Sequence, residues 1–187
     1  MRAPGELTRH LHDDASRTLQ VWRPRDPRLE ALRNQYLEFL AEHPDAMQRD
    51  CIIGHLTASA LVLDESRQRV LLTLHPKVGR WLQLGGHCEA SDADLRAAAA
   101  REAWEEGGIA PLHISHEPVR LDRHPVPCSG AMSEHLDVQY LVVVPTGAQE
   151  IRSDESDDLR WFGVDELPEG TDQSVRALVR DALALGQ

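Results

Sequence analysis

Three glutamates near the middle of the chain have the types and spacing needed to bind a metal ion. Glu102, Glu105 and Glu106 occupy positions i, i+3 and i+4. In a helix, at about 100° of rotation per residue, their carboxylates would share one narrow face. Mg²⁺ uses carboxylate oxygens together with waters and substrate phosphates. The spacing therefore predicts a site for a hard divalent cation, and a solvated acidic stripe is the competing interpretation.

The charges around this acidic face favour the metal interpretation. Arg101 is the basic residue within helical reach, four positions before Glu105, which is the less favourable order for a helical ion pair. Gly107-Gly108 is expected to end the helix, so the carboxylates lie in its last turns, where the helix dipole disfavours each anion by up to about 1 kcal/mol. Repulsion between Glu102 and Glu106 adds roughly 0.2–0.5 kcal/mol. A bound cation would relieve this local conflict, and such conflicts tend to mark functional sites.

A helix packed closely on a sheet is needed to place these carboxylates. The Ala-rich segment 94–106 is predicted to be that helix, with Leu95, Ala99 and Ala103 forming a small apolar stripe at i, i+4 and i+8. Packing of the stripe against a sheet turns the glutamates toward Gly85-Gly86, which we predict to be a loop. Because Gly86 has no side chain, its backbone could approach a metal or a phosphate closely.

The remaining pattern predicts an α+β fold in which helices pack on a mixed sheet, because strands and helices do not alternate in a βαβ rhythm. Strands are expected over 55–63, 70–74, 81–84, 113–121, 136–144 and 159–162, the first two forming a hairpin. Helices are expected from Asp26-Pro27 to just before Pro44, with a shorter one over 7–19, and over 174–185.

The segment Gly86 to Ile109 resembles the signature box of the Nudix hydrolases. That pattern is Gly, five residues, Glu, seven residues, Arg-Glu, an aliphatic residue, any residue, Glu-Glu, any residue, Gly and an aliphatic residue. The matching positions are Gly86, Arg101, Glu102, Ala103, Glu105, Glu106, Gly108 and Ile109. The loop has one residue more than the pattern, because eight residues separate Asp92 from Arg101. The contact of the shifted box glutamate could therefore come from Asp92, from Asp94 or from neither.

The resemblance implies a Nudix-like α/β/α sandwich with a mixed β-sheet over residues 51–187, preceded by an N-terminal helical extension over residues 1–50. It also implies metal-dependent hydrolysis of a phosphoanhydride bond in a nucleoside diphosphate linked to another moiety, by attack of metal-activated water on phosphorus. The metal would be Mg²⁺, with Mn²⁺ as a substitute. Its implied ligands are Glu102, Glu105, Glu106 and the carbonyl of Gly86.

The catalytic roles implied by the resemblance fall on Arg101, Glu105 and Glu106. Arg101 would orient the acidic side chains, and either of the two glutamates could take the proton of the attacking water. A second set of candidates for the general base is Glu134, His135 and Asp137. The residues expected to contact a small nucleotide-type substrate are His87 and Asp137. Substrate choice is expected to depend on the loops 128–134 and 148–157.

Histidines and cysteines offer a different metal site in principle. They are His87, Cys88, His124, Cys128 and His135. Their spacing matches no compact zinc pattern, so we interpret them as packing or supporting residues.

Two other functions are compatible with a Nudix-like architecture. A nucleotide-sensing Nudix-like module would keep the fold without hydrolysis, but such domains usually have a degraded box and an attached basic DNA-binding element. Here the three glutamates are intact, and acidic residues accompany the arginines of the N-terminal segment. An isomerase of diphosphate-bearing lipids would need a catalytic cysteine, and nothing singles out Cys51 or Cys128.

Composition and charge narrow the expected partners and cellular location of the protein. Against 20 basic residues the chain has 31 acidic ones, a formal net charge of -11, which argues against a nucleic-acid partner. No apolar stretch approaches the roughly 18 residues that span a bilayer, and the first residues lack a signal-type apolar stretch. An odd number of widely spaced cysteines argues against a disulfide framework. We expect a cytoplasmic protein without a membrane partner, in which exposed Trp22 and Tyr36 could form a homodimer contact.

Overall fold

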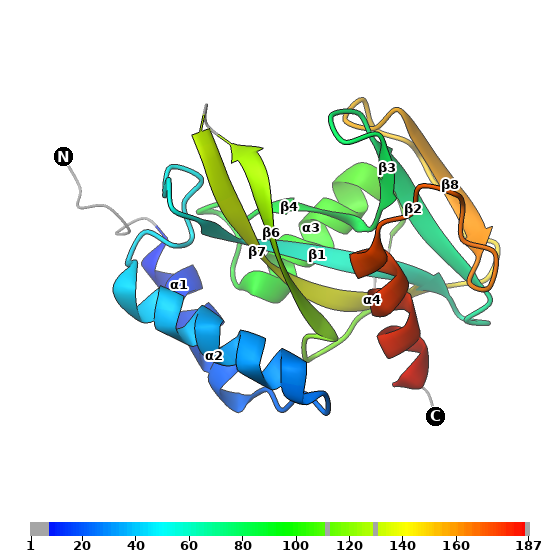
Figure 1. The fold of residues 1–187 in the computed structure, drawn as a ribbon. Coiled ribbons are helices and arrows are strands. Elements are labelled where there is room, and N and C mark those ends of the chain that lie inside the picture. The colour runs from blue at the N-terminus through cyan, green and yellow to red at the C-terminus, as the bar shows by residue number, and fades with distance from the viewer. Residues whose placement is uncertain (1–7, 111–112, 129–130, 186–187) are drawn as a thin grey trace.

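A curled mixed sheet lies between helices in the computed structural model, which describes residues 8–110, 113–128 and 131–185 (Figure 1). Its strands are β1 (His55–Asp64), β2 (Arg69–His75), β3 (Arg80–Leu82), β4 (Leu84–His87), β5 (His113–Ile114), β6 (Arg120–Cys128), β7 (Ala131–Val144) and β8 (Asp158–Gly163). The helices are α1 (Arg9–Val21), α2 (Pro27–Glu42), α3 (Leu95–Gly107) and α4 (Gln173–Ala184). The helices and strands β1, β2 and β8 therefore lie close to where the sequence predicted them, whereas most of β6 was not expected to form a strand.

Strand β1 is the centre of the sheet. It pairs in parallel with β7 and in antiparallel fashion with β2 and β4, which gives the mixed sheet that was predicted. The strand order is β3-β2-β1-β7-β5, with β4 on β1, β6 on β7 and β8 on β2. Because β2 and β4 contact different ends of β1, they share one of its edges.

The alternation of side chains along β1 separates two layers of core. Ala58 packs in one cluster with Leu95 and Ala98 of α3, whereas Leu61 and Leu63 pack against α4. Successive side chains of a strand point to opposite faces. Helices α3 and α4 therefore cover opposite faces of the sheet, which confirms the predicted α/β/α sandwich (Figure 1).

The two N-terminal helices share their core with the sheet. Leu11, Leu19 and Leu40 are buried in the same cluster as Leu56 and Leu136 of the sheet. Helices α1 and α2 therefore pack in the same hydrophobic core as the sheet and α3.

The expectation that Trp22 and Tyr36 are exposed is wrong. Trp22 is 4% exposed and Tyr36 is 0% exposed. The Tyr36 hydroxyl lies 2.7 Å from the Asp122 carbonyl oxygen and 3.2 Å from that of Asp137, and it donates to this pair. Both aromatic side chains are buried by other parts of the same chain, so neither is available for a homodimer contact.

Two predicted elements differ from the structure. Gly85 and Gly86 belong to strand β4, where they pair with Ser59 and Ala58, and do not form a loop. A Cβ atom at Gly85 would lie 2.3 Å from the Cβ of Ser59, so only glycine allows this pairing. The segment 113–121, predicted as one strand, contains the short strand β5 and the first two residues of β6, and Pro118, which has no backbone donor, lies between them.

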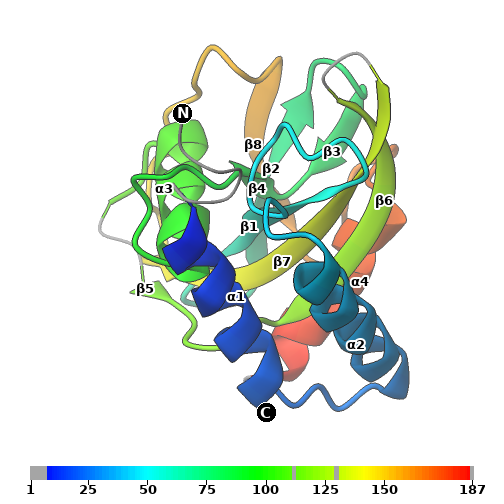
Figure 2. The ribbon, with the colours of Figure 1, turned by 90° about the vertical axis from the view of Figure 1, so that its left-hand side faces the viewer.

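Helix α1 contacts the start of helix α3 through polar side chains, and Figure 2 shows the two helices side by side. His10 Nε2 donates to the carbonyl oxygen of Asp92 at 2.8 Å. The Asp14 carboxylate accepts from the backbone N–H of Leu95 at 3.0 Å, and Asp94 caps the same helix by accepting from Ala97 at 2.6 Å. Helix α1 thus supplies a second cap for α3 from a distant part of the chain.

Replacement of Asp14 by alanine should therefore destabilise the protein. The Leu95 N–H would lose its acceptor, and loss of such a cap costs about 1 kcal/mol. Urea unfolding measures the change, with Asp13→Ala on the exposed side of the same helix as the control. Equal unfolding free energies for the two variants would contradict this role of Asp14.

Candidate active site

Helix α3 places two of its carboxylates against strand β4. Glu102 and Glu106 are each 9% exposed. One Glu106 oxygen accepts from the Gly85 N–H at 3.1 Å. A Cβ atom at Gly86 would lie 2.8 Å from a Glu102 oxygen, so the missing side chain makes room for that carboxylate. The helix ends at Gly108, whose φ of 66° is the left-handed conformation that glycine favours.

Arg101 connects the acidic residues of the site. Its guanidinium donates to both oxygens of Asp92, at 2.9 and 3.1 Å. It also donates to Glu102 at 3.0 Å and to Glu105 at 2.8 Å. A further bond of 2.9 Å reaches the carbonyl oxygen of His87 at the end of β4. Arg101 therefore fixes the side of α3 that carries the glutamates, and the hydrogen bonds to Asp92 raise the pKa of Arg101 further.

The loop with the extra residue also has a defined arrangement. Of the alternatives left open by the sequence, Asp92 provides the acidic contact to Arg101, with a side chain only 5% exposed. Asp94 instead caps α3 through the N–H of Ala97. The additional residue is accommodated in the loop because Asp92 folds back to accept from the Glu89 N–H at 2.7 Å.

Burial and mutual repulsion perturb the two inner glutamates. Burial raises the pKa of Glu102 to about 7, although Arg101 acts in the opposite direction. Burial also raises the pKa of Glu106 to about 8, against the Gly85 hydrogen bond, and the charge of Glu102 adds to the rise. The charge of Glu155 contributes to both shifts. Glu155 lies in the loop 148–157. Substrate choice was expected to depend on this loop, but the sequence did not single out Glu155.

The three box glutamates thus occupy different environments. Glu102 and Glu106 are buried beside the two glycines, whereas the Glu105 side chain is 46% exposed and held by Arg101. The carboxylates of Glu102 and Glu106, whose pKa values are raised, repel each other when both are ionised. A divalent cation would relieve this repulsion.

Asp137 lies at the centre of a buried polar network. Its carboxylate accepts from Thr57 at 3.0 Å, Ser59 at 2.6 Å, Gln83 at 3.1 Å and Gln139 at 3.0 Å. Burial raises the pKa of Asp137. A direct contact between Asp137 and a substrate would require one of these donors to move.

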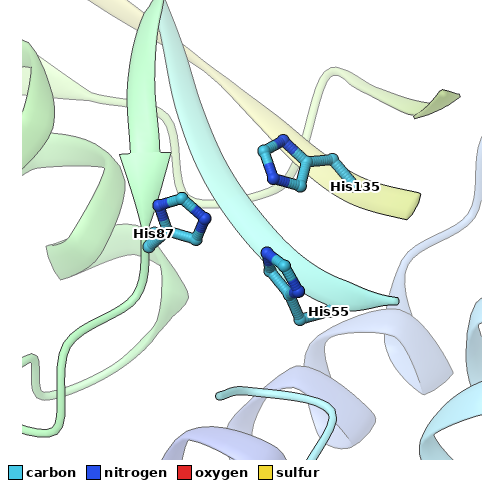
Figure 3. A group of neighbouring side chains, drawn as sticks. All are labelled: His55, His87 and His135. Carbon is cyan, nitrogen blue, oxygen red and sulfur yellow. The ribbon is translucent and has the colours of Figure 1, made fainter. Parts of the chain in front are cut away.

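The other predicted site residues lie on β7 and β4. Glu134 pairs with Arg123 across β6 and β7 at 2.9 Å. His87 and His135 meet His55, which sequence reasoning did not single out, and Figure 3 shows the three rings turned toward one another. Burial lowers the pKa of His87 to about 4 and that of His135 to about 3, so both rings are neutral near pH 7. Residues 129–130 of the predicted substrate loop lie outside the described part of the chain.

A family model described as the NUDIX domain matches residues 54–182. The chain belongs to the Nudix family. The match includes the whole box from Gly86 to Ile109, and it confirms the resemblance read from the sequence. With this membership and three intact box glutamates, the protein is a Nudix-type pyrophosphohydrolase. A search of curated proteins finds no match.

Solved structures of Nudix proteins share the fold. A NUDIX hydrolase from Clostridium perfringens is 22% identical, with a TM-score of 0.57 over 71% of this chain and 98% of that chain. An Ap4A hydrolase from C. elegans, in a binary complex, is 18% identical, with a TM-score of 0.55 over 70% and 96%. The NUDIX domain of Shewanella oneidensis NrtR, solved with ADP ribose, is 21% identical, with a TM-score of 0.55 over 80% and 97%. None of the helices described for this Nudix protein is long and apolar enough to cross a membrane.

The raised pKa of Glu106 predicts how stability depends on pH. Between its usual pKa of 4.5 and the folded value of about 8, folded Glu106 keeps a proton that the unfolded chain releases, so rising pH removes stability. In metal-free buffer, Glu106→Gln should therefore gain several degrees in Tm over the wild type between pH 5 and pH 8, because 1 kcal/mol corresponds to about 2–4 °C at this size.

Thermal unfolding at several pH values with a chelator present measures this difference. Glu117→Gln, at an exposed position outside the site, serves as the matched control and should follow the wild type. If the Tm difference between Glu106→Gln and the wild type stays constant with pH, the burial argument for Glu106 is incorrect.

Proposed function

We propose that this Nudix protein hydrolyses a phosphoanhydride bond in a nucleoside diphosphate linked to another moiety, and that it requires Mg²⁺, with Mn²⁺ as a substitute. The observation that carries the proposal is the placement of Glu102 and Glu106, both buried, against Gly85 and Gly86. Such a pair of crowded carboxylates is costly in a protein that binds no cation.

The residues present fit a magnesium-class ion. Glu102, Glu105 and Glu106 supply hard oxygen donors, and the absence of a side chain on Gly86 lets the Glu102 carboxylate lie against the backbone of β4. We assign these four residues as the ligands. When bound, Mg²⁺ neutralises phosphate charge and lowers the pKa of a coordinated water.

Arg101 positions the acidic side chains in this proposal. Its bonds to Asp92 and to the His87 carbonyl fix the guanidinium, which in turn holds Glu102 and Glu105. Catalysis then depends on orientation of the diphosphate and on electrostatic stabilisation of the charge that develops during in-line attack on phosphorus.

Glu105 and Glu106 are our candidates for the group that takes the proton from the attacking water. Glu105 is accessible to solvent, and a carboxylate that binds the metal can also accept the proton of a coordinated water, which applies to both residues. Glu155 is a further candidate, because its charge acts on both inner glutamates. The buried network around Asp137 and the pairing of Glu134 with Arg123 make these two residues weaker candidates.

The substrate class rests on the family and on the compounds named with its structural neighbours. Ap4A and ADP ribose, named with two of them, both contain phosphoanhydride bonds between a nucleoside and another group. We therefore place the substrate among small nucleotide-type molecules of this chemistry. His87, which follows Gly86 at the end of β4, is the residue expected to contact such a substrate. The loop that carries Glu155 is the element we expect to select the second moiety.

Substitution of Glu106 should abolish most of the activity. Glu106→Gln removes a metal ligand while keeping the size of the side chain and its acceptor for the Gly85 N–H, so we expect at least a hundredfold loss of kcat. A Mg²⁺-dependent assay of phosphate or nucleotide release, run across dinucleotide polyphosphates, nucleotide sugars, ADP-ribose and damaged nucleoside triphosphates, provides the measurement.

Glu117→Gln is the control and should retain wild-type activity. A loss of less than tenfold in Glu106→Gln would refute Glu106 as a central metal ligand.

A nucleotide-sensing role is the second candidate, since the NrtR domain with ADP ribose shares the fold. The same assay separates the two functions. Saturable binding of ADP-ribose without turnover in any substrate class would favour sensing over hydrolysis.

A further inference from the structure

Three histidines form a cluster that the carboxylate site does not use. His55 at the start of β1 is the direct partner of His135 on β7 in the parallel ladder. His87 ends β4 and pairs with Thr57, two residues after His55 on the same face of β1. The register of three strands, and not spacing along the chain, therefore brings the rings together (Figure 3).

The geometry of the cluster suits a single ion. The ring centroids of the three histidines lie 4.9 to 5.1 Å apart. One ligand nitrogen from each ring lies within 4.8 Å of those of the other two. Zn–N bonds of about 2.0–2.1 Å require nitrogens roughly 3.3 Å apart in a tetrahedral site, so small side-chain rotations would complete the arrangement.

Unsatisfied buried nitrogens point to a ligand at this position. Within the described part of the chain, Nε2 of His55 and Nε2 of His135 are buried without a hydrogen-bond partner. His55 is only 1% exposed, and its Nδ1 lies 3.5 Å from the carbonyl oxygen of Cys51. A proton on Nδ1 would face that carbonyl and leave the lone pair of Nε2 available, which is the usual arrangement of a metal-binding histidine. Buried nitrogens of this kind normally have a partner.

We propose that His55, His87 and His135 bind a divalent ion of the zinc class. Imidazole nitrogens suit Zn²⁺, Co²⁺, Ni²⁺ and Cu²⁺, whereas Mg²⁺ prefers oxygen ligands. The site therefore differs in metal preference from the glutamate site. Three protein ligands leave a fourth position for water or for an anionic group.

The histidine site and the glutamate site lie on opposite sides of β4. Gly86 faces Glu102 on the α3 side, and the next residue of an extended strand points the other way. An ion on the histidines would link β1, β4 and β7 at the end of β4 that carries Gly86. Because its ring nitrogen would bind this ion, His87 would interact with a substrate only by way of the bound metal.

Another group of potential ligands lies nearby and must be distinguished. His43, Asp45 and Cys51 also approach one another within metal-binding range. Among the described residues, the buried side-chain nitrogens and oxygens without a partner include two of the histidine cluster and none of His43 or Asp45. The three histidines are therefore the better ligand set.

Zinc titration of the full chain tests the proposal independently of the hydrolase activity. The protein is stripped with a chelator, dialysed into buffer with excess Mg²⁺ to occupy the carboxylates, and titrated with ZnCl₂ by calorimetry. We expect one Zn²⁺ per chain, with affinity at least tenfold weaker in His135→Gln and in His87→Gln. Cys51→Ser and His113→Gln, the latter an exposed histidine of β5, should bind like the wild type.

X-ray absorption at the zinc edge of the wild-type protein adds a measurement that needs no variant. We expect a shell of nitrogen and oxygen with imidazole scattering and no sulfur. The proposal is overturned by absence of stoichiometric zinc, by unchanged affinity in the two ligand variants once circular dichroism shows that they fold, or by sulfur in the zinc shell.

Discussion

Burial of two like-charged carboxylates between α3 and β4 is the constraint on which the site depends. Glu102 and Glu106 can approach the strand only because Gly85 fits against Ser59 and Gly86 leaves space for an acidic side chain. The small stripe of α3, with Ala99 0% and Ala103 1% exposed, lets the helix lie close to the sheet. Each of these features brings negative charge closer to the backbone of β4 than an ordinary helix–sheet contact would.

The rest of the molecule holds this arrangement in place. Arg101 and Asp92 form a bidentate pair that fixes the loop before α3. Helix α1 contacts the same loop through His10 and the first residue of α3 through Asp14. Although the family match begins at residue 54, the N-terminal helices therefore support the helix that carries the box. This contact gives the extension a structural role in the site.

Local signals predicted the parts of the site that depend on one segment. Gly108 ends α3 as the Gly107-Gly108 pair predicted, and the shared face of the glutamates along α3 followed directly from helical geometry, whereas the role of Asp94 as the N-cap was not predicted. Features that depend on strand register could not be read in the same way. Glycines are depleted in strands, so Gly85-Gly86 resembled a loop, and the meeting of His55 with His135 required the parallel pairing of β1 with β7. Burial of Trp22 and Tyr36 was missed because it arises from packing between distant segments.

The most direct test of the central claim is a crystal of the protein soaked in Mn²⁺ and measured at a wavelength where manganese scatters anomalously. The account predicts an anomalous peak between Gly86 and the carboxylates of Glu102 and Glu106, with both side chains turned toward the ion. Crystals that show no peak there at saturating Mn²⁺, with the carboxylates directed away from β4, would contradict it.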